Sequence, residues 1–173
     1  MRKILPASFF ARPTPAVARD LLGKYIVRRW RGREIALMIT EVEAYDGPKD
    51  RASHASRGRT ARNDVMFGPP GIFYVYFTYG MHWMLNVVTG RRDYPATVLI
   101  RAAGGVTGPA RLTKFLHVGG AQNKTPAARG TGLWFEDRGV RVPRATIATM
   151  KRVGVDYAGT VWAEKPFRFM MLP

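Results

Sequence analysis

The chain has 173 residues, 46% of them hydrophobic, which is the size of one domain with a sizeable core. Lys and Arg number 28 against 12 Asp and Glu, a formal charge of +16, so the expected partner is a polyanion such as nucleic acid. Cysteine is absent, which excludes disulfides, thiolate metal sites and cysteine nucleophiles.

The N-terminal apolar residues are interrupted by Pro6, Arg12 and Pro13, so no run has the length of a signal peptide. No stretch approaches the roughly 20 apolar residues of a membrane span, and no long amphipathic Lys/Arg helix is visible. We therefore expect a soluble, cytoplasmic protein with no membrane partner, and we favour nucleic acid over an anionic membrane.

In chain order, the first expected helix starts at Thr14, whose hydroxyl is able to cap, and stops at Gly23. A strand is expected over 24–30, a turn at Gly32 and a second strand over 34–44. With a regular pleat, every second residue of this strand faces the same side. One apolar face would then continue into two carboxylates, its members being Ile35, Leu37, Ile39, Glu41 and Glu43. Pairing of one or both acids with arginine is the simpler explanation of their presence.

A loop rich in Gly, Pro, Ser and Asn is expected over 47–71, with His54 among several arginines. Long ordered loops in small domains are usually functional or mobile. The arginines together with nearby hydroxyl and amide groups are typical of phosphate contacts, although a solvated surface run and a structural histidine would also explain them.

Residues 72–78 and 81–88 predict a hairpin with Tyr79 and Gly80 in its tight turn. Phe73, Val75 and Phe77 would share the core face, opposite the face of Tyr74, Tyr76 and Thr78. A tyrosine at an exposed tip is harder to assign to a core.

A short buried strand is expected over 97–100, ending in Arg101. Thr107 to Pro109 then opens a helix with Leu112, Phe115 and Leu116 on one side, closed by Gly119 and Gly120. Further strands are expected over 133–135, 140–142, 147–155 and 167–171. The three histidines lack the spacing of a metal site, so we expect no metal.

Four motifs in the same order, EVEAY, RASHASRGRTARNDVMFGPPG, YVYFTYGMHWMLNVV and VLIRA, closely resemble the alkyladenine (3-methyladenine) DNA glycosylase family of base-excision repair. The resemblance extends weakly to both ends and covers most of the chain. One departure follows Arg101, where the family usually carries an additional helical segment and this chain has only AAGGVT, which affects one wall of the DNA surface.

The resemblance implies catalytic and pocket roles for the matching residues. Glu43 would be the general base that deprotonates the attacking water, and Arg101 would help to hold that water. Tyr45, His54 and Tyr76 would sandwich a purine flipped out of the duplex. Aromatic rings attract a positively charged alkylated base more strongly than a normal one.

The resemblance also implies the contacts that select and hold the substrate. Asn86 would exclude the exocyclic amino group of guanine, and Tyr79 would enter the duplex in place of the flipped nucleotide. The other expected DNA contacts are Met81, Arg57, Arg59 and Arg62.

The implied protein is a single α+β domain over residues 1–173, with a mixed, largely antiparallel sheet, short flanking helices and a protruding hairpin. We expect a monomeric, monofunctional glycosylase that acts on duplex DNA with damaged purines, associates with the nucleoid, needs no cofactor and has no lyase activity. The alternative is a non-catalytic basic nucleic-acid-binding module, and the glutamate, the arginine and three pocket rings together argue against it.

Overall fold

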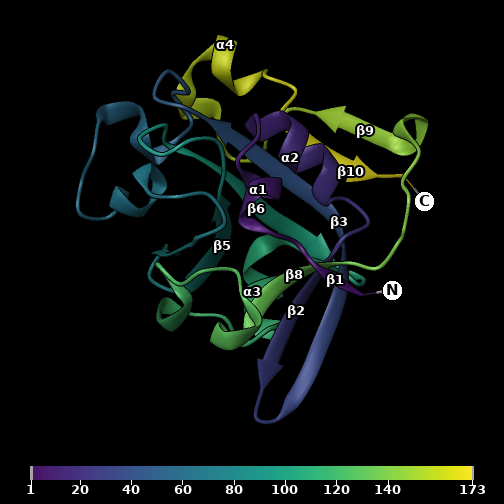
Figure 1. The fold of residues 1–173 in the computed structure, drawn as a ribbon. Coiled ribbons are helices and arrows are strands. Elements are labelled where there is room, and N and C mark those ends of the chain that lie inside the picture. The colour runs from purple at the N-terminus through teal and green to yellow at the C-terminus, as the bar shows by residue number, and fades with distance from the viewer. Residues whose placement is uncertain (1, 173) are drawn as a thin grey trace.

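The computed structural model describes residues 2–172 (Figure 1). The strands in this part are β1 (Lys3–Ile4), β2 (Tyr25–Trp30), β3 (Arg33–Asp46), β4 (Phe73–Thr78), β5 (His82–Val88), β6 (Ala96–Ala103), β7 (Val106–Thr107), β8 (Leu133–Asp137), β9 (Ile147–Met150) and β10 (Arg168–Met171). The α-helices are α1 (Ala7–Phe10), α2 (Thr14–Leu21), α3 (Pro109–Phe115) and α4 (Thr160–Ala163). Six 3₁₀ turns are η1 (His54–Arg57), η2 (Asp64–Phe67), η3 (Gly120–Gln122), η4 (Arg129–Thr131), η5 (Arg144–Thr146) and η6 (Asp156–Ala158).

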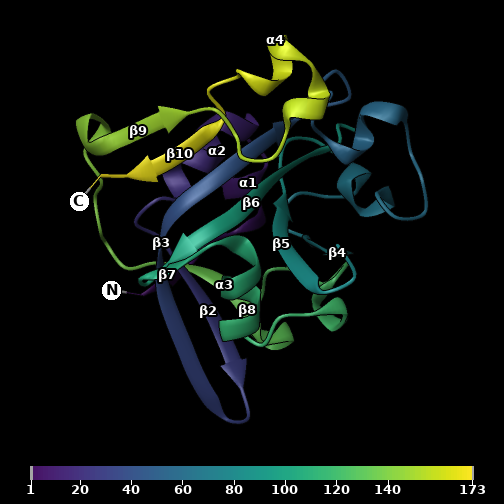
Figure 2. The ribbon, with the colours of Figure 1, turned by 180° about the vertical axis from the view of Figure 1, so that it is seen from behind.

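All ten strands join in one sheet, whose main path runs β1-β8-β2-β3-β6-β5-β4. Strand β10 pairs with β3 beside β2, β9 pairs with β10, and β7 pairs with β6. Every pairing between these strands is antiparallel. The predicted α+β class with a largely antiparallel sheet is confirmed, and Figure 2 shows β3, β6 and β5 crossing the centre of the molecule.

The main core lies between the sheet and helices α1, α2 and α3. Val17 and Leu21 of α2 and Leu112 and Leu116 around α3 are fully buried in it, because residues three and four apart share a helix face. Phe115, predicted on the same side, is instead exposed. None of the helices in residues 2–172 is long and apolar enough to cross a membrane.

Several predicted elements are confirmed, and a few were wrong in extent. The helix begins at Thr14, but its hydroxyl bonds to Thr89 in the core rather than capping the helix. Strand β6 does not end at Arg101 and continues to Ala103. Residues 140–142 are not a strand, and the strand predicted over 147–155 ends at Met150.

The pleat of β3 is not regular, which overturns the predicted shared face of Ile39, Glu41 and Glu43. Register shifts occur on both sides of Glu41 in the pairing with β6. As a result Ile39, Val42 and Ala44 all lie in the main core, and Glu43 points to the other face of the sheet. Two adjacent irregularities therefore remove the acids from the core face.

The β4–β5 hairpin turns at Tyr79 and Gly80, which both have positive φ, 52° and 66°. Positive φ at both central residues is what a type I′ hairpin turn requires. Phe77, predicted in the core, is exposed near this tip and stacks against Trp83 with ring centroids 4.8 Å apart. The hairpin that projects furthest from the body is β2–β3, at the bottom of Figure 1.

The short segment after Arg101 forms a further tight hairpin. Ala102 pairs with Thr107 and Ala103 with Val106, so only Gly104 and Gly105 lie in the turn. Both glycines have positive φ, 57° and 83°, a conformation that side-chain-bearing residues rarely adopt. The sheet thus leads directly into α3 without an intervening helix.

Candidate active site

One row of paired residues crosses four strands on the sheet face opposite the main core. Tyr74 pairs with Asn86, Asn86 with Leu99, and Leu99 with Glu43. Directly opposed residues in a sheet point to the same side. Glu43 and Asn86, which lie 43 residues apart in sequence, therefore face the same surface.

The Glu43 side chain has 0% exposure and is held at both carboxylate oxygens. Oε1 accepts a hydrogen bond from the Val153 backbone N–H at 2.8 Å and lies 3.3 Å from Arg101 Nη1. Oε2 accepts from the Tyr45 hydroxyl at 2.9 Å. A buried carboxylate is costly unless it is paired, and these three donors supply the pairing.

Arg101 contacts both predicted acids, since its Nε also lies 3.1 Å from Glu41 Oε1. Glu41 has a second basic neighbour, Arg168, at 3.5 Å. The prediction that the acids pair with arginine is therefore confirmed for both. Glu43 differs from Glu41 in being fully buried and in its bond to Tyr45.

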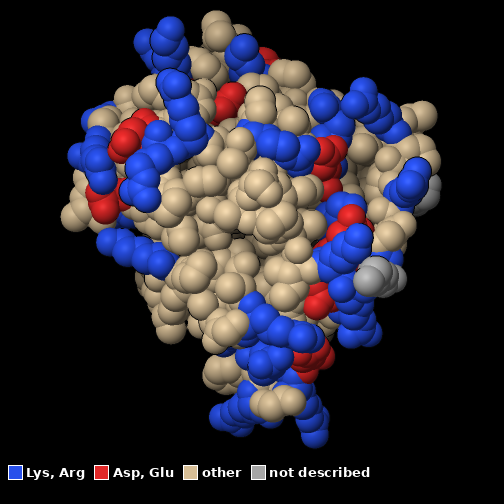
Figure 3. Space-filling model, in the orientation of Figure 1, with Lys and Arg blue, Asp and Glu red and all other residues tan. Residues whose placement is uncertain are grey.

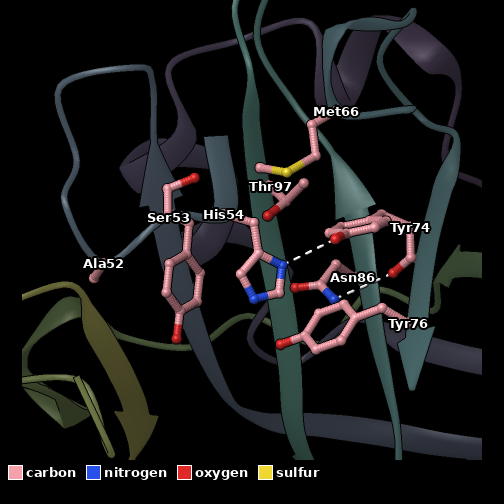
Figure 4. A pocket seen from close by; sticks show the side chains of 9 residues that line it. Ala52, Ser53, His54, Met66, Tyr74, Tyr76, Asn86 and Thr97 are labelled. Atoms are coloured by element: carbon pink, nitrogen blue, oxygen red, sulfur yellow. Dashed lines mark hydrogen bonds between the residues drawn. The ribbon is translucent and has the colours of Figure 1, made fainter. Parts of the chain in front are cut away.

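An aromatic pocket adjoins Glu43 through Tyr45, which is one of its lining residues. Figure 4 shows His54, Tyr76 and Asn86 pointing toward one another in this pocket. His54 and Met66 come from the loop, and Tyr76 and Asn86 come from the hairpin. The full lining is Tyr45, Ala52, Ser53, His54, Met66, Tyr74, Tyr76, Asn86 and Thr97. Its free volume is about 20 Å³, roughly the space of one water molecule.

Three rings, those of His54, Tyr74 and Tyr76, contact one another along one side of this pocket. The His54 and Tyr76 centroids are 4.6 Å apart at 67°, and His54 Nδ1 lies 2.9 Å from the Tyr74 hydroxyl. Although His54 is exposed at the mouth, desolvation by the surrounding protein lowers its pKa, and the charge of Arg62 lowers it further. The imidazole is therefore neutral at neutral pH.

The pocket tyrosines are held in their protonated form. Burial, followed by the negative charge of Glu43, raises the pKa of Tyr45 well above its usual range. Burial raises the pKa of Tyr74 to about 12 and also raises that of Tyr76. Each hydroxyl thus remains a hydrogen-bond donor at neutral pH.

The Asn86 amide is also fixed, because Nδ2 donates to the Tyr74 backbone carbonyl at 3.2 Å. At the other end of the hairpin, Tyr79 is 81% exposed and Met81 is 67% exposed. Arg62 donates to the Phe77 carbonyl at 3.0 Å, so it braces this hairpin from the loop. The structure thus gives the hairpin a fixed, solvent-exposed tip.

The loop arginines differ in their contacts. Arg59 pairs with Asp64 at 2.7 Å, whereas Arg57 is exposed and has no acidic partner within 4.0 Å among residues 2–172. A hollow of about 540 Å³ beside the aromatic pocket is lined by Arg51, Ser53, His54, Ser56, Arg57 and Tyr157. Figure 3 shows further Lys and Arg residues gathered on the projecting β2–β3 hairpin.

Sequence reasoning missed the segment after β9. Val153 contributes only a backbone N–H to Glu43, and a backbone donor leaves no signature in the residue type. Arg152 and Asp50 form a buried ion pair behind Tyr45. Arg152 fell in the strand predicted over 147–155 and Asp50 in the loop predicted over 47–71, and neither assignment indicates an ion pair between them. No group of three or more His, Asp or Glu that could hold a metal occurs within residues 2–172.

The chain matches the model of the family described as Methylpurine-DNA glycosylase over residues 8–107 and 104–172, two segments that meet at the β6–β7 hairpin. Proteins named "Putative 3-methyladenine DNA glycosylase" are similar to it. One from Anaeromyxobacter sp. (strain Fw109-5) is 44% identical over 174 residues, which cover 96% of this chain and 88% of that protein. One from Methanocella arvoryzae is 43% identical over 96% of this chain and 91% of that protein. One from Rickettsia rickettsii is 37% identical, with coverages of 96% and 89%.

Proposed function

The chain belongs to the methylpurine-DNA glycosylase family, and on this premise we propose that it releases alkylated or deaminated purines from duplex DNA by hydrolysis. The observation that carries the proposal is Glu43, a fully buried carboxylate joined by a tyrosine hydroxyl to an aromatic pocket. A module that only bound DNA would have no use for an acid in this position.

In the proposed reaction Glu43 takes a proton from a water molecule. The water oxygen bonds to C1′ of the deoxyribose as the C1′–N bond breaks, and the base leaves with the bonding electrons. An alkylated, positively charged purine leaves as a neutral molecule, so no strong general acid is needed. A neutral deaminated purine leaves as an anion and takes up a proton from water. Arg101 stabilises the carboxylate before the transfer and helps to orient the water.

The target nucleotide has to leave the duplex before this chemistry. In the proposal Tyr79, exposed at the tip of a rigid turn, occupies the vacated space and offsets part of the few kcal/mol of unstacking. The expelled base then stacks between Tyr45, His54 and Tyr76. Monofunctional action follows if water, rather than a lysine amine, attacks C1′.

Base entry requires the pocket to widen. Its free volume of about 20 Å³ is roughly that of one water molecule, far less than a purine base occupies. His54 belongs to the loop and Tyr76 to the sheet, so we expect the loop side to move. Binding of the base and closure of the loop would then be coupled.

A direct test incubates the protein with a panel of duplexes that each carry one modified purine. We expect release of free base from at least one alkylated purine, with the strand left intact until alkali cleaves the abasic site. Breakage before alkali would contradict the monofunctional mechanism. Binding to every duplex without release of any base would favour the non-catalytic DNA-binding module.

A further inference from the structure

Behind the pocket, Arg152 and Asp50 form an ion pair in which both side chains are fully buried. The guanidinium uses both terminal nitrogens on the carboxylate, with Nη2 2.9 Å from Oδ1 and Nη1 bonded to Oδ2. The same nitrogens donate to two backbone carbonyls, Ala44 at 2.9 Å and Trp162 at 3.2 Å. Four bonds thus fix the plane of one buried guanidinium.

This guanidinium reaches the catalytic strand at the residue between the two site side chains. Its bond to the Ala44 carbonyl holds the β3 backbone between Glu43 and Tyr45. The Cζ atom of Arg152 lies 4.7 Å from the centroid of the Tyr45 ring, so the guanidinium packs against the side of this ring that faces away from the pocket. The next residue in the chain, Val153, donates its N–H to Glu43 at 2.8 Å.

The other half of the pair holds the pocket loop. Asp50 Oδ1 accepts from the Ala52 N–H at 3.1 Å, and Oδ2 accepts from the Asp46 N–H at 3.0 Å. Its backbone carbonyl accepts from the Ser53 N–H at 2.8 Å, one residue before His54. Asp50 therefore fixes the stretch of chain that leads from β3 into the pocket lining.

Resting on the proposed function, we propose that Arg152 and Asp50 are positioning residues for base release: together they hold Glu43, Tyr45 and the root of the His54 loop in one arrangement. Neither touches the pocket, since neither lines it. Buried ion pairs add little net stability compared with apolar packing of similar volume. The four hydrogen bonds of this bidentate pair fix the positions of the site residues, which apolar packing alone would not do.

The test replaces Arg152 with lysine, which keeps the charge and cannot reproduce the planar set of four bonds. We expect the single-turnover rate of base release to fall about 100-fold, as for a displacement of about 1 Å at a reacting group. Affinity for a duplex with an abasic site is expected to stay at the wild-type level, because the exposed hairpin tip with Tyr79 and Met81 makes none of the hydrogen bonds of Arg152.

Arg138→Lys is the matched control. Arg138 also makes two bonds to a buried carboxylate, that of Glu136, at 2.8 and 2.9 Å. Glu136 lies in β8, which contributes no residue to the pocket lining. The melting temperature should fall in both variants, and the single-turnover rate of base release should fall only in Arg152→Lys. Asp50→Asn, which keeps the shape of the side chain, provides the same comparison where Arg152→Lys does not fold.

A wild-type rate in folded Arg152→Lys and Asp50→Asn overturns the positioning role and leaves the proposed function standing. An equal loss of abasic-site affinity and rate also overturns it, since the pair would then act on general integrity. Wild-type protein that binds lesion duplexes and releases no base refutes the proposed function itself, together with this inference.

Discussion

Glu43 and Asn86 point to the same face of the sheet from strands separated only by β6, because both residues pair with Leu99. Neighbouring strands lie about 4.8 Å apart, so the two side chains are rooted about 10 Å apart across the sheet. In the proposed mechanism the acid acts at the sugar end of the purine and the amide at its far edge. One row of the sheet would then carry both the chemistry and the selection.

This relationship depends on the double irregularity beside Glu41. A shift of one residue in strand pairing turns every following side chain to the opposite face. Without the shifts Val42 would point to the site and Glu43 into the apolar core. The irregular pleat is therefore as necessary to the site as the glutamate.

Replacing Glu43 with glutamine should leave lesion-duplex binding intact and lower the single-turnover rate by about 10²- to 10⁴-fold, the usual contribution of a general base. The amide preserves the shape of the side chain and cannot take a proton. Glu41→Gln is the control, and its loss should be much smaller because Glu41 bonds only to basic residues beside the site. Equal rates for Glu43→Gln and wild type would refute Glu43 as the base.

Acidification should destabilise the protein partly through His54. Its pKa is lowered in the folded state by desolvation and by Arg62, from the usual value of 6.5. At a pH between the lowered folded-state pKa and 6.5, the unfolded chain binds more protons than the folded protein. The contribution of His54 to folding stability is therefore fully present above pH 6.5 and is lost as the pH falls toward the lowered pKa. His54→Gln should therefore show a smaller drop in melting temperature from pH 7 to about pH 5 than wild type. Identical drops would remove His54 from the acid response.

Much of the fold was predictable because periodicity and turn residues are local signals. The alternation from Phe73 to Thr78 correctly separated core-facing Phe73 and Val75 from site-facing Tyr74 and Tyr76. Alternation does not show where a strand extends beyond the part of the sheet that the core covers. Phe77, near the exposed end of β4, was therefore wrongly assigned to the core.

The parts of the site that escaped prediction are those set by pairing and by backbone groups. Irregular pleating at Glu41 arises from two strands in contact, which no single strand records. The Val153 N–H is a donor that every residue except proline possesses. Even the Arg152–Asp50 pair joins segments 102 residues apart, where sequence spacing carries no information.

Salt dependence should separate the two loop arginines. Each phosphate contact contributes about 0.9 to the slope of log affinity against log salt, so Arg57→Ala should reduce the slope by about that amount for undamaged duplex. Arg59→Ala should change it less, because Arg59 already pairs with Asp64 at 2.7 Å. Base release in single turnover should stay unchanged for both. An unaltered slope for Arg57→Ala would make this arginine ordinary solvated surface.

The hairpin tip can be tested without disturbing its turn. Tyr79→Asn removes the ring and keeps a residue that tolerates the positive φ of 52°. Affinity for abasic duplex should fall by at least about 1 kcal/mol of stacking, roughly fivefold, with little change for undamaged duplex. Phe115→Ser, at another exposed aromatic, serves as the control and should change neither. Equal losses on both duplexes would make Tyr79 a general contact.

Asn86 should select against guanine in the pocket. The amide nitrogen donates to the Tyr74 carbonyl at 3.2 Å, so the side chain cannot rotate away without breaking that bond. A guanine in the pocket would push its exocyclic amino group against this fixed amide, whereas adenine-like bases carry only hydrogen at the same carbon. Asn86→Ser shortens the side chain and should relieve the clash.

The expected gain is small, because a normal guanine is a poor leaving group and is not a cation for the rings to favour. We expect slow release of guanine from undamaged or mismatched duplex by Asn86→Ser, with activity on alkylated adenine retained. Serine also leaves the Tyr74 carbonyl without its donor, and so a modest loss of stability should accompany the change. Asn63→Ser, which removes another buried amide from the loop outside the pocket lining, controls for that loss and should release no guanine. Guanine release by Asn86→Ser no faster than by wild type would assign the exclusion to another part of the pocket.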